Sequence, residues 1–171
     1  NEVSGEPLHL NEIVEELDKY ETSVKTYDEM EAFIYGMFFG DGSCGCYDTK
    51  WGLKYSWAIN NSNNKLLEQC KLYLEELYGE NTNFKILNTM KSSGVDKLVP
   101  YGSIKYMVDL FRNLFYDKDK YKIVPNKILN GSYEVRKNFF LGYYAADGYK
   151  CRNVKAKNIC FSNKGKIGSS Q

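Results

Sequence analysis

Apolar side chains recur every three or four residues in separate stretches of the first 121 residues, a spacing typical of helices with one buried face. The first stretch follows Asp28, a candidate N-cap with Glu31 three residues later, and is expected to end at Gly42. Its apolar positions are Met30, Phe33, Ile34, Met37 and Phe38. A second stretch carries Leu66, Cys70, Leu74 and Leu77 and ends at Gly79. The third carries Ile104, Met107, Val108, Phe111, Leu114 and Phe115.

Short segments of alternating polarity lie between these helices and predict strands. Two candidates are broken by Gly45 and Gly52, and residues 53–59 alternate with period two. Tyr55 and Trp57 fall on the face opposite Lys54 and are interpreted as core residues. Residues 84–87 and 95–99 predict a second strand pair. The expected order is helix, strand, strand, helix, strand, strand, helix.

This order begins again after residue 121, which indicates an internal repeat. We expect a helix over residues 134–146 that ends at Gly148 and is followed by a basic strand pair at 149–153 and 155–161. The chain then divides into an acidic lead-in segment (1–26), a first repeat (27–121), and a linker with an incomplete second repeat (122–171). By comparison with the first repeat, roughly fifty residues of the second are expected from a C-terminal segment or a second chain.

Charge is distributed unevenly, although the net charge is only +1. Residues 1–31 carry ten acids and two lysines, a net −8, which leaves +9 for residues 32–171. From Gly148 to Gln171 there are six bases and no acid, so this end of the chain is a candidate for binding a polyanion.

The remaining composition indicates a soluble intracellular protein, in a compartment that the sequence does not define. No apolar stretch approaches the roughly 18 residues that a membrane span requires, and no signal peptide is apparent, so no membrane partner is expected. The five cysteines form no zinc-type pair, which favours a reducing environment. Cys44 and Cys46 lie on alternate positions of one predicted strand and are assigned to packing rather than to a soft metal.

Two segments share one pattern: a small residue, three large residues, another small residue, then Asp-Gly. They are Gly36-Met-Phe-Phe-Gly40-Asp41-Gly42 and Gly142-Tyr-Tyr-Ala-Ala146-Asp147-Gly148. A glycine inside a helix costs about 0.5–1 kcal/mol relative to alanine, so its presence needs a compensating reason. Small residues four apart form a flat stripe through which two helices can approach closely. We therefore expect these two helices to pack through Gly36, Gly40, Gly142 and Ala146.

Such packing would bring Asp41 and Asp147 to the C-terminal ends of neighbouring helices, where backbone carbonyls already concentrate negative charge. A divalent cation relieves this repulsion, and Mg²⁺ binds through one or two carboxylates plus water and phosphate oxygens. Gly42 and Gly148 are expected to leave the helices in a left-handed conformation. Either Asp-Gly pair alone is explained by a simple helix-ending turn, whereas two matching copies favour a metal site that activates water for phosphodiester hydrolysis.

The two segments resemble the paired LAGLIDADG, or dodecapeptide, motifs of homing endonucleases. The segment Lys122-Ile-Val-Pro125-Asn-Lys-Ile-Leu129 resembles the lysine and proline segment that precedes the second motif in intein-borne members. The resemblance covers residues 27–171 and makes the lead-in segment a candidate intein-side linker. It implies an α+β fold of pseudo-symmetric tandem αββαββα repeats, the second truncated in this chain, that form a β-saddle on duplex DNA.

The resemblance also implies a chemistry. Asp41 and Asp147 would be the catalytic ligands of Mg²⁺ or another divalent cation, and Lys122 would be a catalytic basic residue near the scissile phosphate. A second active-site lysine, expected late in the second repeat, has no position in the sequence. Splicing signals of an intein are also missing, since residue 1 is neither Cys nor Ser and His9 is the single histidine.

Basic residues on the predicted strands are candidates for DNA phosphate contacts, because those of the last two strands keep one parity. They are Lys50, Lys54, Lys150, Arg152, Lys155 and Lys157. A solvated basic face is the alternative for these residues. The function indicated is a Mg²⁺-dependent site-specific DNA endonuclease that cuts both strands. The alternatives are a cleavage-inactive DNA- or RNA-binding relative, either maturase-like or a degenerate intein insert, and a purely structural insert.

Overall fold

The computed structural model describes residues 25–152, and the chain divides into two compact units. One unit contains the described residues up to Gly40 together with those from Lys122 onwards, and we call it the helical unit. The other runs from Asp41 to Tyr121, and we call it the sheet unit. Each unit is considered by itself.

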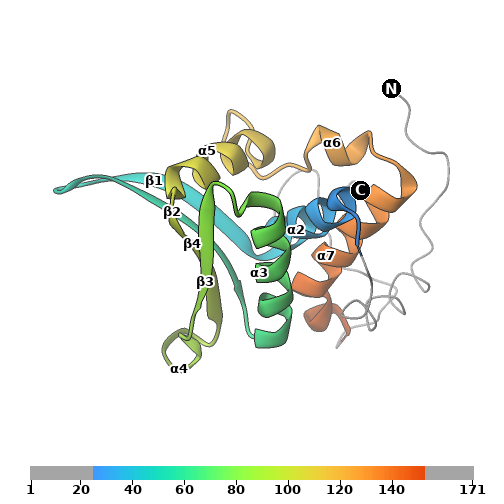
Figure 1. Ribbon diagram of the computed structural model, residues 1–171, viewed down its shortest axis with the longest axis horizontal. Coiled ribbons are helices and arrows are strands. Elements are labelled where there is room, and N and C mark those ends of the chain that lie inside the picture. Colours follow the sequence, from blue (N-terminus) through green and yellow to red (C-terminus); the bar gives the residue numbers. More distant parts are fainter. Residues whose placement is uncertain (1–24, 153–171) are drawn as a thin grey trace. The chain divides into compact units, whose positions relative to one another are not determined.

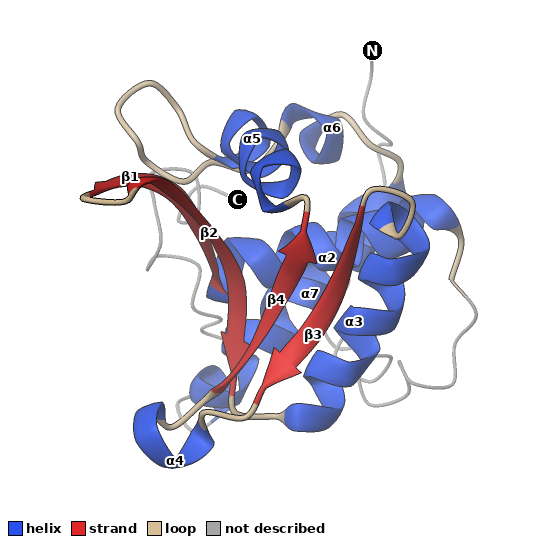
Figure 2. Cartoon of the chain, turned by 60° about the vertical axis from the view of Figure 1, so that its left-hand side comes forward, coloured by secondary structure: helices blue, strands red, loops and turns tan. Residues whose placement is uncertain are grey.

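The sheet unit contains four strands and three helices after Asp41 (Figure 1). In chain order they are β1 (Gly42–Thr49), β2 (Gly52–Asn61), α3 (Asn64–Tyr78), β3 (Thr82–Leu87), α4 (Met90–Ser93), β4 (Asp96–Gly102) and α5 (Ile104–Phe115). The strands form one antiparallel sheet in the order β1-β2-β4-β3 (Figure 2). The predicted order of elements is confirmed, and the short helix α4 is an addition that the sequence pattern did not indicate.

The core of the sheet unit lies between α3, α5 and one face of the sheet. Trp57 of β2 is only 2% exposed, and its ring meets Phe84 of β3 at 6.3 Å and Phe111 of α5 at 5.2 Å between centroids. Phe111 also contacts Tyr78 of α3 at 6.1 Å, so both helices cover the same face. The assignment of Trp57 to the core is confirmed, whereas Tyr55 is only partly buried.

Strands β1 and β2 extend beyond the rest of the sheet as a two-stranded arm (Figure 1). They pair along their whole length, whereas β2 pairs with β4 only at residues 59–61. Pro100 lies in β4 two residues beyond Leu98, the last β4 residue paired with β2, and a proline has no amide hydrogen to donate to a neighbouring strand. The glycines do not break the strands as expected: Gly45 lies inside β1, and Gly52 begins β2 with φ +109°.

The helical unit contains α2 (Tyr27–Asp41) up to Gly40, the short α6 (Asn126–Leu129) and α7 (Tyr133–Arg152). A reciprocal capping box starts α2: the amide of Glu29 donates to the Thr26 hydroxyl at 3.2 Å, and the Thr26 amide donates to the Glu29 carboxylate at 3.1 Å. The predicted N-cap, Asp28, is therefore wrong, because Thr26 holds that position. Glu31 is buried instead, paired with Lys127 of α6 at 2.8 Å.

The two helix ends expected at Asp-Gly pairs have different outcomes: α2 ends beside Gly42 as predicted but without the expected left-handed glycine, and α7 does not end at Gly148. Helix α2 ends at Asp41, and Gly42 enters β1 without a positive φ, since the described glycines with positive φ are Gly52, Gly94 and Gly102. Helix α7 continues through Gly148 to Arg152, so residues 149–152 are helical rather than part of a strand. A glycine costs a helix only about 1 kcal/mol, which does not by itself end it. The expected strand at 155–161 lies outside the described residues.

Cys44 is half-buried but Cys46 is exposed, so the assignment of Cys46 to packing is wrong. This follows from its position in the arm, where fewer elements cover the strands. In the described part of the chain, no helix has the length and apolar character needed to cross a membrane.

The burial of Trp57 gives a test of the sheet unit's core. Trp57→Ala is expected to lower the free energy of unfolding by about 3–5 kcal/mol, because it leaves a cavity among aromatic rings. The matched control is Trp51→Ala at the exposed tip of the arm, which should change stability by less than about 0.5 kcal/mol. Urea denaturation followed by circular dichroism measures both. Equal losses for the two variants would contradict this description of the core.

Candidate functional site

Helices α2 and α7 contact each other through glycines within the helical unit. A Cβ atom added to Gly36 would overlap the carbonyl oxygen of Phe139 and lie 2.6 Å from the amide nitrogen of Tyr143. On the opposite side, a Cβ atom added to Gly142 would overlap the carbonyl oxygen of Phe33. The two backbones therefore touch directly, at a distance that a side chain at either position would prevent.

The same contact continues toward the C-terminal end of α2. A Cβ atom added to Gly40 would lie 2.7 Å from Cβ of Ala146 and 3.4 Å from Oδ2 of Asp147. The structure thus brings together all four small residues that the sequence analysis selected. Asp147 is 3% exposed and lies beside Gly40, the residue that precedes Asp41 in α2.

Asp41, the last residue of α2, is held by a side chain that the sequence analysis did not select. Nδ2 of Asn61, at the end of β2, donates a 2.7 Å hydrogen bond to Oδ2 of Asp41. Oδ1 of Asn61 in turn accepts a 2.8 Å hydrogen bond from the amide of Asn63, the N-cap of α3. Asn61 therefore fixes the Asp41 carboxylate against a rigid strand–helix junction. The available signal was the uninterrupted polar run at 60–64, between a predicted strand and a predicted helix.

Cys70 of α3 lies close enough to Asp41 for an electrostatic interaction between its thiol and the Asp41 carboxylate. Burial first, and the Asp41 carboxylate second, raise the pKa of the Cys70 thiol above its usual value. The thiol stays protonated at neutral pH, and a protonated thiol is not a metal ligand.

The oxygen donors fit a hard divalent cation better than a soft one. The described residues contain no cluster of three or more His, Cys, Asp or Glu side chains that would form a complete metal cage. Asp41 and Asp147 carry the hard carboxylate oxygens that Mg²⁺ prefers.

Lys122 lies at the C-terminal end of α2. Its Nζ donates to the carbonyl oxygens of Phe38 at 2.8 Å and Phe39 at 3.2 Å, and it lies 5.0 Å from the centroid of the Phe38 ring. A cation at this position stabilises the partial negative charge of the helix end. The structure therefore places this ammonium group at the end of the helix that carries Asp41.

The face of the sheet opposite α3 and α5, which we call the open face, carries lysines and, among the described strands, no acidic side chain. Strand alternation places Lys54, Lys85 and Lys97 on it, because they alternate with the buried Trp57, Phe84 and Leu98. Lys85 lies 5.3 Å from the ring centroid of Tyr101, also on this face. The sequence analysis selected Lys54 but missed Lys85 and Lys97. Both alternate with apolar residues along a predicted strand, and this pattern could have identified them as lying on the exposed face.

The other predicted phosphate contacts have different outcomes. Lys50 lies in the turn of the arm, with its Nζ 5.2 Å from the Trp51 ring centroid. Lys150 and Arg152 belong to α7, so their expected strand parity is wrong. Lys155 and Lys157 lie outside the described residues.

No family model matches the chain. It is 52% identical over 145 residues to a DNA polymerase of Acanthamoeba polyphaga mimivirus, a match that covers 83% of this chain and 8% of the polymerase. The chain thus corresponds to a small part of that relative's length.

Solved structures of the homing endonuclease I-DmoI have a similar fold. Its mesophilic variants match with a TM-score of 0.54 at 18% identity, over 71% of this chain and 59% of theirs. A variant complex with target DNA nicked in the coding strand, in the presence of manganese, matches with a TM-score of 0.51 at 16% identity, covering 71% and 63%. Another variant complex with target DNA and magnesium gives 0.53 at 17%, covering 70% and 62%. The chain therefore has an α+β fold similar to that of I-DmoI, and the match spans less than two thirds of each of these chains.

The contact between α2 and α7 can be tested at Gly36. Alanine has the higher helix propensity, by about 1 kcal/mol, yet Gly36→Ala is expected to lower the free energy of unfolding by about 3 kcal/mol because its Cβ would overlap a backbone carbonyl. Chemical denaturation measures the difference. The control is Gly45→Ala, whose Cβ would meet no backbone atom and would lie 3.2 Å from the hydroxyl oxygen of the exposed Tyr47 side chain. A stabilising effect of Gly36→Ala would show that the two helix backbones do not touch.

Proposed function

We propose that this chain is the catalytic domain of a metal-dependent, site-specific DNA endonuclease of the LAGLIDADG homing type. The observation that carries the proposal is the glycine-mediated contact of α2 and α7, which matches small residues in two copies of one motif that each end in Asp-Gly. The fold shared with I-DmoI, which was solved with its target DNA and with manganese or magnesium, supports it.

Asp41 and Asp147 are the proposed metal ligands, one from each copy of the motif. A divalent cation bound by them would stabilise negative charge on a phosphodiester and lower the pKa of a bound water. Asn61 orients the Asp41 carboxylate through its 2.7 Å hydrogen bond, so that this ligand does not have to be ordered when DNA binds. The burial of Asp147 excludes water from its surroundings and strengthens its electrostatic interactions.

Lys122 is the proposed cationic residue near the scissile phosphate. Its ammonium group is already held at the C-terminal end of α2 by two carbonyl oxygens. The role proposed for Lys122 is to stabilise charge that develops on the phosphate during cleavage.

The open face supplies the proposed DNA surface. Lys54 and Lys85 are exposed, and Lys97 is half-buried. No acidic side chain of the described strands lies on the same face as these lysines. Phosphate contacts of this kind orient a protein on duplex DNA without reading its sequence. Lys50, at the end of the arm, extends the same charge.

We also propose that the endonuclease is intein-borne, carried within a longer polypeptide. The relative that supports this is a DNA polymerase of which the matched region is 8%. The alternative is a cleavage-inactive binding relative, which would retain the DNA surface and lose the metal chemistry.

Conservative removal of either carboxylate tests the metal site. Asp41→Asn and Asp147→Asn are each expected to reduce cleavage in Mg²⁺ by at least about a hundredfold while binding is retained, because each removes a charged ligand. The assay uses the complete natural protein and a duplex selected from a randomised library. Asp119→Asn, an exposed residue of the linker, is the control. If the unaltered protein binds its selected duplex and never cuts it, the binding relative is the correct assignment.

The open face is tested by the salt dependence of DNA binding. Each phosphate contact contributes about 0.9 to the slope of log K against log salt on duplex DNA, so Lys85→Gln with Lys97→Gln should reduce the slope by about 2. The measurement is fluorescence anisotropy with a labelled duplex at several salt concentrations. Lys71→Gln is the matched control, because this lysine lies on α3 and is paired with Glu75 at 2.9 Å. An equal reduction by the control would remove the open face as the binding surface.

A further inference from the structure

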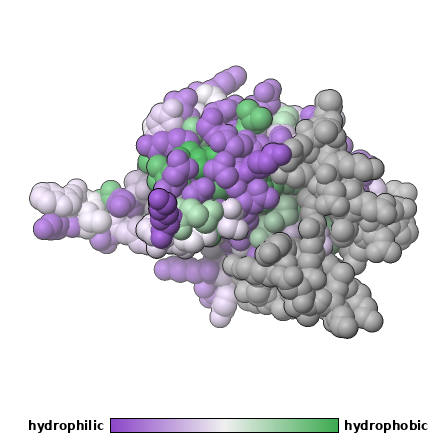
Figure 3. Space-filling model, turned by 90° about the horizontal axis from the view of Figure 1, so that it is seen from below, coloured by the Kyte–Doolittle hydropathy of each residue, from purple (hydrophilic) through white to green (hydrophobic). Residues whose placement is uncertain are grey.

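The tip of the arm holds a tryptophan in solvent. Trp51 is 86% exposed, and Tyr47 and Leu53 near it are exposed as well. The turn itself is fixed: the Thr49 hydroxyl accepts from the Trp51 amide at 3.1 Å and donates to the Gly52 carbonyl at 2.6 Å. In Figure 3 the arm is the narrow projection at the left. Burying a large aromatic side chain stabilises a protein by about 3 kcal/mol, so a tryptophan held in water at a fixed turn indicates a contact surface.

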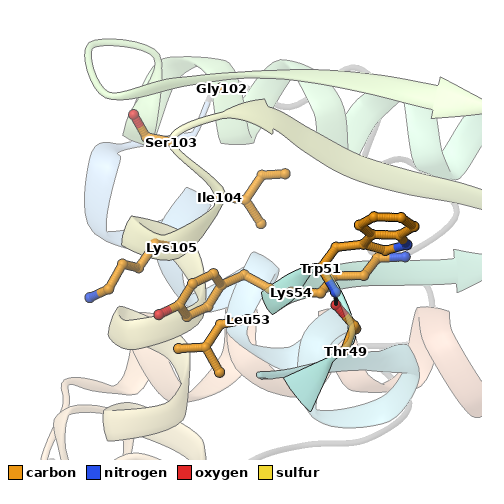
Figure 4. Close-up of a pocket in the computed structure, with 9 residues that line it drawn as sticks. Thr49, Trp51, Leu53, Lys54, Gly102, Ser103, Ile104 and Lys105 are labelled. Carbon is orange, nitrogen blue, oxygen red and sulfur yellow. Dashed lines mark hydrogen bonds between the residues drawn. The ribbon is translucent and has the colours of Figure 1, made fainter. Parts of the chain in front are cut away.

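An open pocket of about 760 Å³ lies next to this turn. Trp51 and Lys105 stand at opposite sides of it, with Ile104 between them (Figure 4). The pocket exists because β2 pairs with β4 only at residues 59–61, so the arm and the turn from β4 into α5 diverge. Pro100, with no amide hydrogen, lies where the two strands separate.

The lining of this pocket combines aromatic and apolar side chains with amines. Trp51, Leu53, Tyr55 and Ile104 supply the apolar part, and none of the lining residues is acidic. Lys105 lies 5.8 Å from the Tyr55 ring centroid, and its ammonium is also bonded to Asp109 at 2.6 Å. Lys54, which strand alternation assigns to the open face, also lines the pocket, whereas Leu53 and Tyr55 line it from the opposite face of β2. Aromatic rings beside amines are the combination on which bases stack while their phosphates are neutralised.

We infer that this pocket binds an unpaired nucleobase of the bound DNA, with the base stacked on Trp51 and its phosphate near Lys54. The inference rests on the proposed DNA-binding function and adds a ligand to it. The pocket lies in the size range of small-ligand sites, which accommodates a base with its sugar. A base that is already unpaired costs least to expose, so the pocket selects a bulged or single-stranded position over a paired one.

Tryptophan fluorescence gives a direct test, because the chain has two tryptophans and only Trp51 is exposed, Trp57 being 2% exposed. The whole chain is titrated with a duplex and with the same duplex carrying one unpaired adenine. We expect the bulged duplex to bind about tenfold more tightly and to quench the Trp51 emission. Trp51→Ala should lose this preference and the quenching, and Trp51→Phe should keep part of the preference. Leu72→Ala, an exposed apolar residue of α3, is the control and should keep both.

The outcomes separate this inference from the proposed function. Equal binding of the two duplexes without quenching would overturn the pocket assignment and leave DNA binding intact. Binding of neither duplex would overturn both. If Trp51→Ala keeps the preference for the bulged duplex, the base is held elsewhere and the pocket is not its site. If quenching occurs only with an added acidic peptide, the occupant is a protein segment and the nucleobase assignment is wrong.

Discussion

The close approach of two helix backbones is the constraint on which the candidate site depends. Gly36 and Gly142 each lie where a single Cβ atom would overlap a carbonyl oxygen of the other helix, and Gly40 lies against Ala146 and Asp147. Each glycine reduces helix stability in isolation, and the contact offsets that cost by allowing dispersion interactions along both backbones. The rings of Phe39 and Tyr143, 5.4 Å apart, pack beside it. Asp41 directly follows Gly40, and Asp147 directly follows Ala146, so each acid adjoins a small residue of this contact.

The periodic parts of the fold could be predicted from the sequence, because burial of one face imposes the spacing. Helix α3 shows this well: the apolar residues at its predicted positions are buried, and it ends before Gly79 as expected. The helix ends at Asp-Gly pairs could not be predicted in the same way. Gly148 lies inside α7, because a glycine is compatible with a helix end but does not force the helix to stop there. Thr26 rather than Asp28 starts α2 because a threonine with a glutamate three residues later satisfies two backbone amides at once.

The two candidate acids could be selected from the sequence, whereas most of the groups that contact them could not. The doubled motif selects Asp41 and Asp147 from sequence alone, since two copies share one spacing. Asn61 is separated from Asp41 by the whole β1–β2 hairpin, so its hydrogen bond depends on strand register, which local patterns do not specify. Lys122 reaches carbonyls more than eighty residues earlier in the chain, a contact that only the tertiary fold defines. Lys85 and Lys97 share a face because β3 and β4 pair, and they become a candidate surface only once that pairing is known.

The limited pairing of β2 with β4 has a geometric consequence for the arm. A two-stranded ribbon coils more strongly than a wider sheet, because no third strand restrains the right-handed rotation between neighbours. The major groove of B-form DNA is about 12 Å wide and admits a two-stranded ribbon, and the groove also winds right-handedly. Because β2 is not paired with β4 before Ile59, β1 and β2 are free to twist as a ribbon, whereas the strands beneath α3 and α5 are restrained by their neighbours.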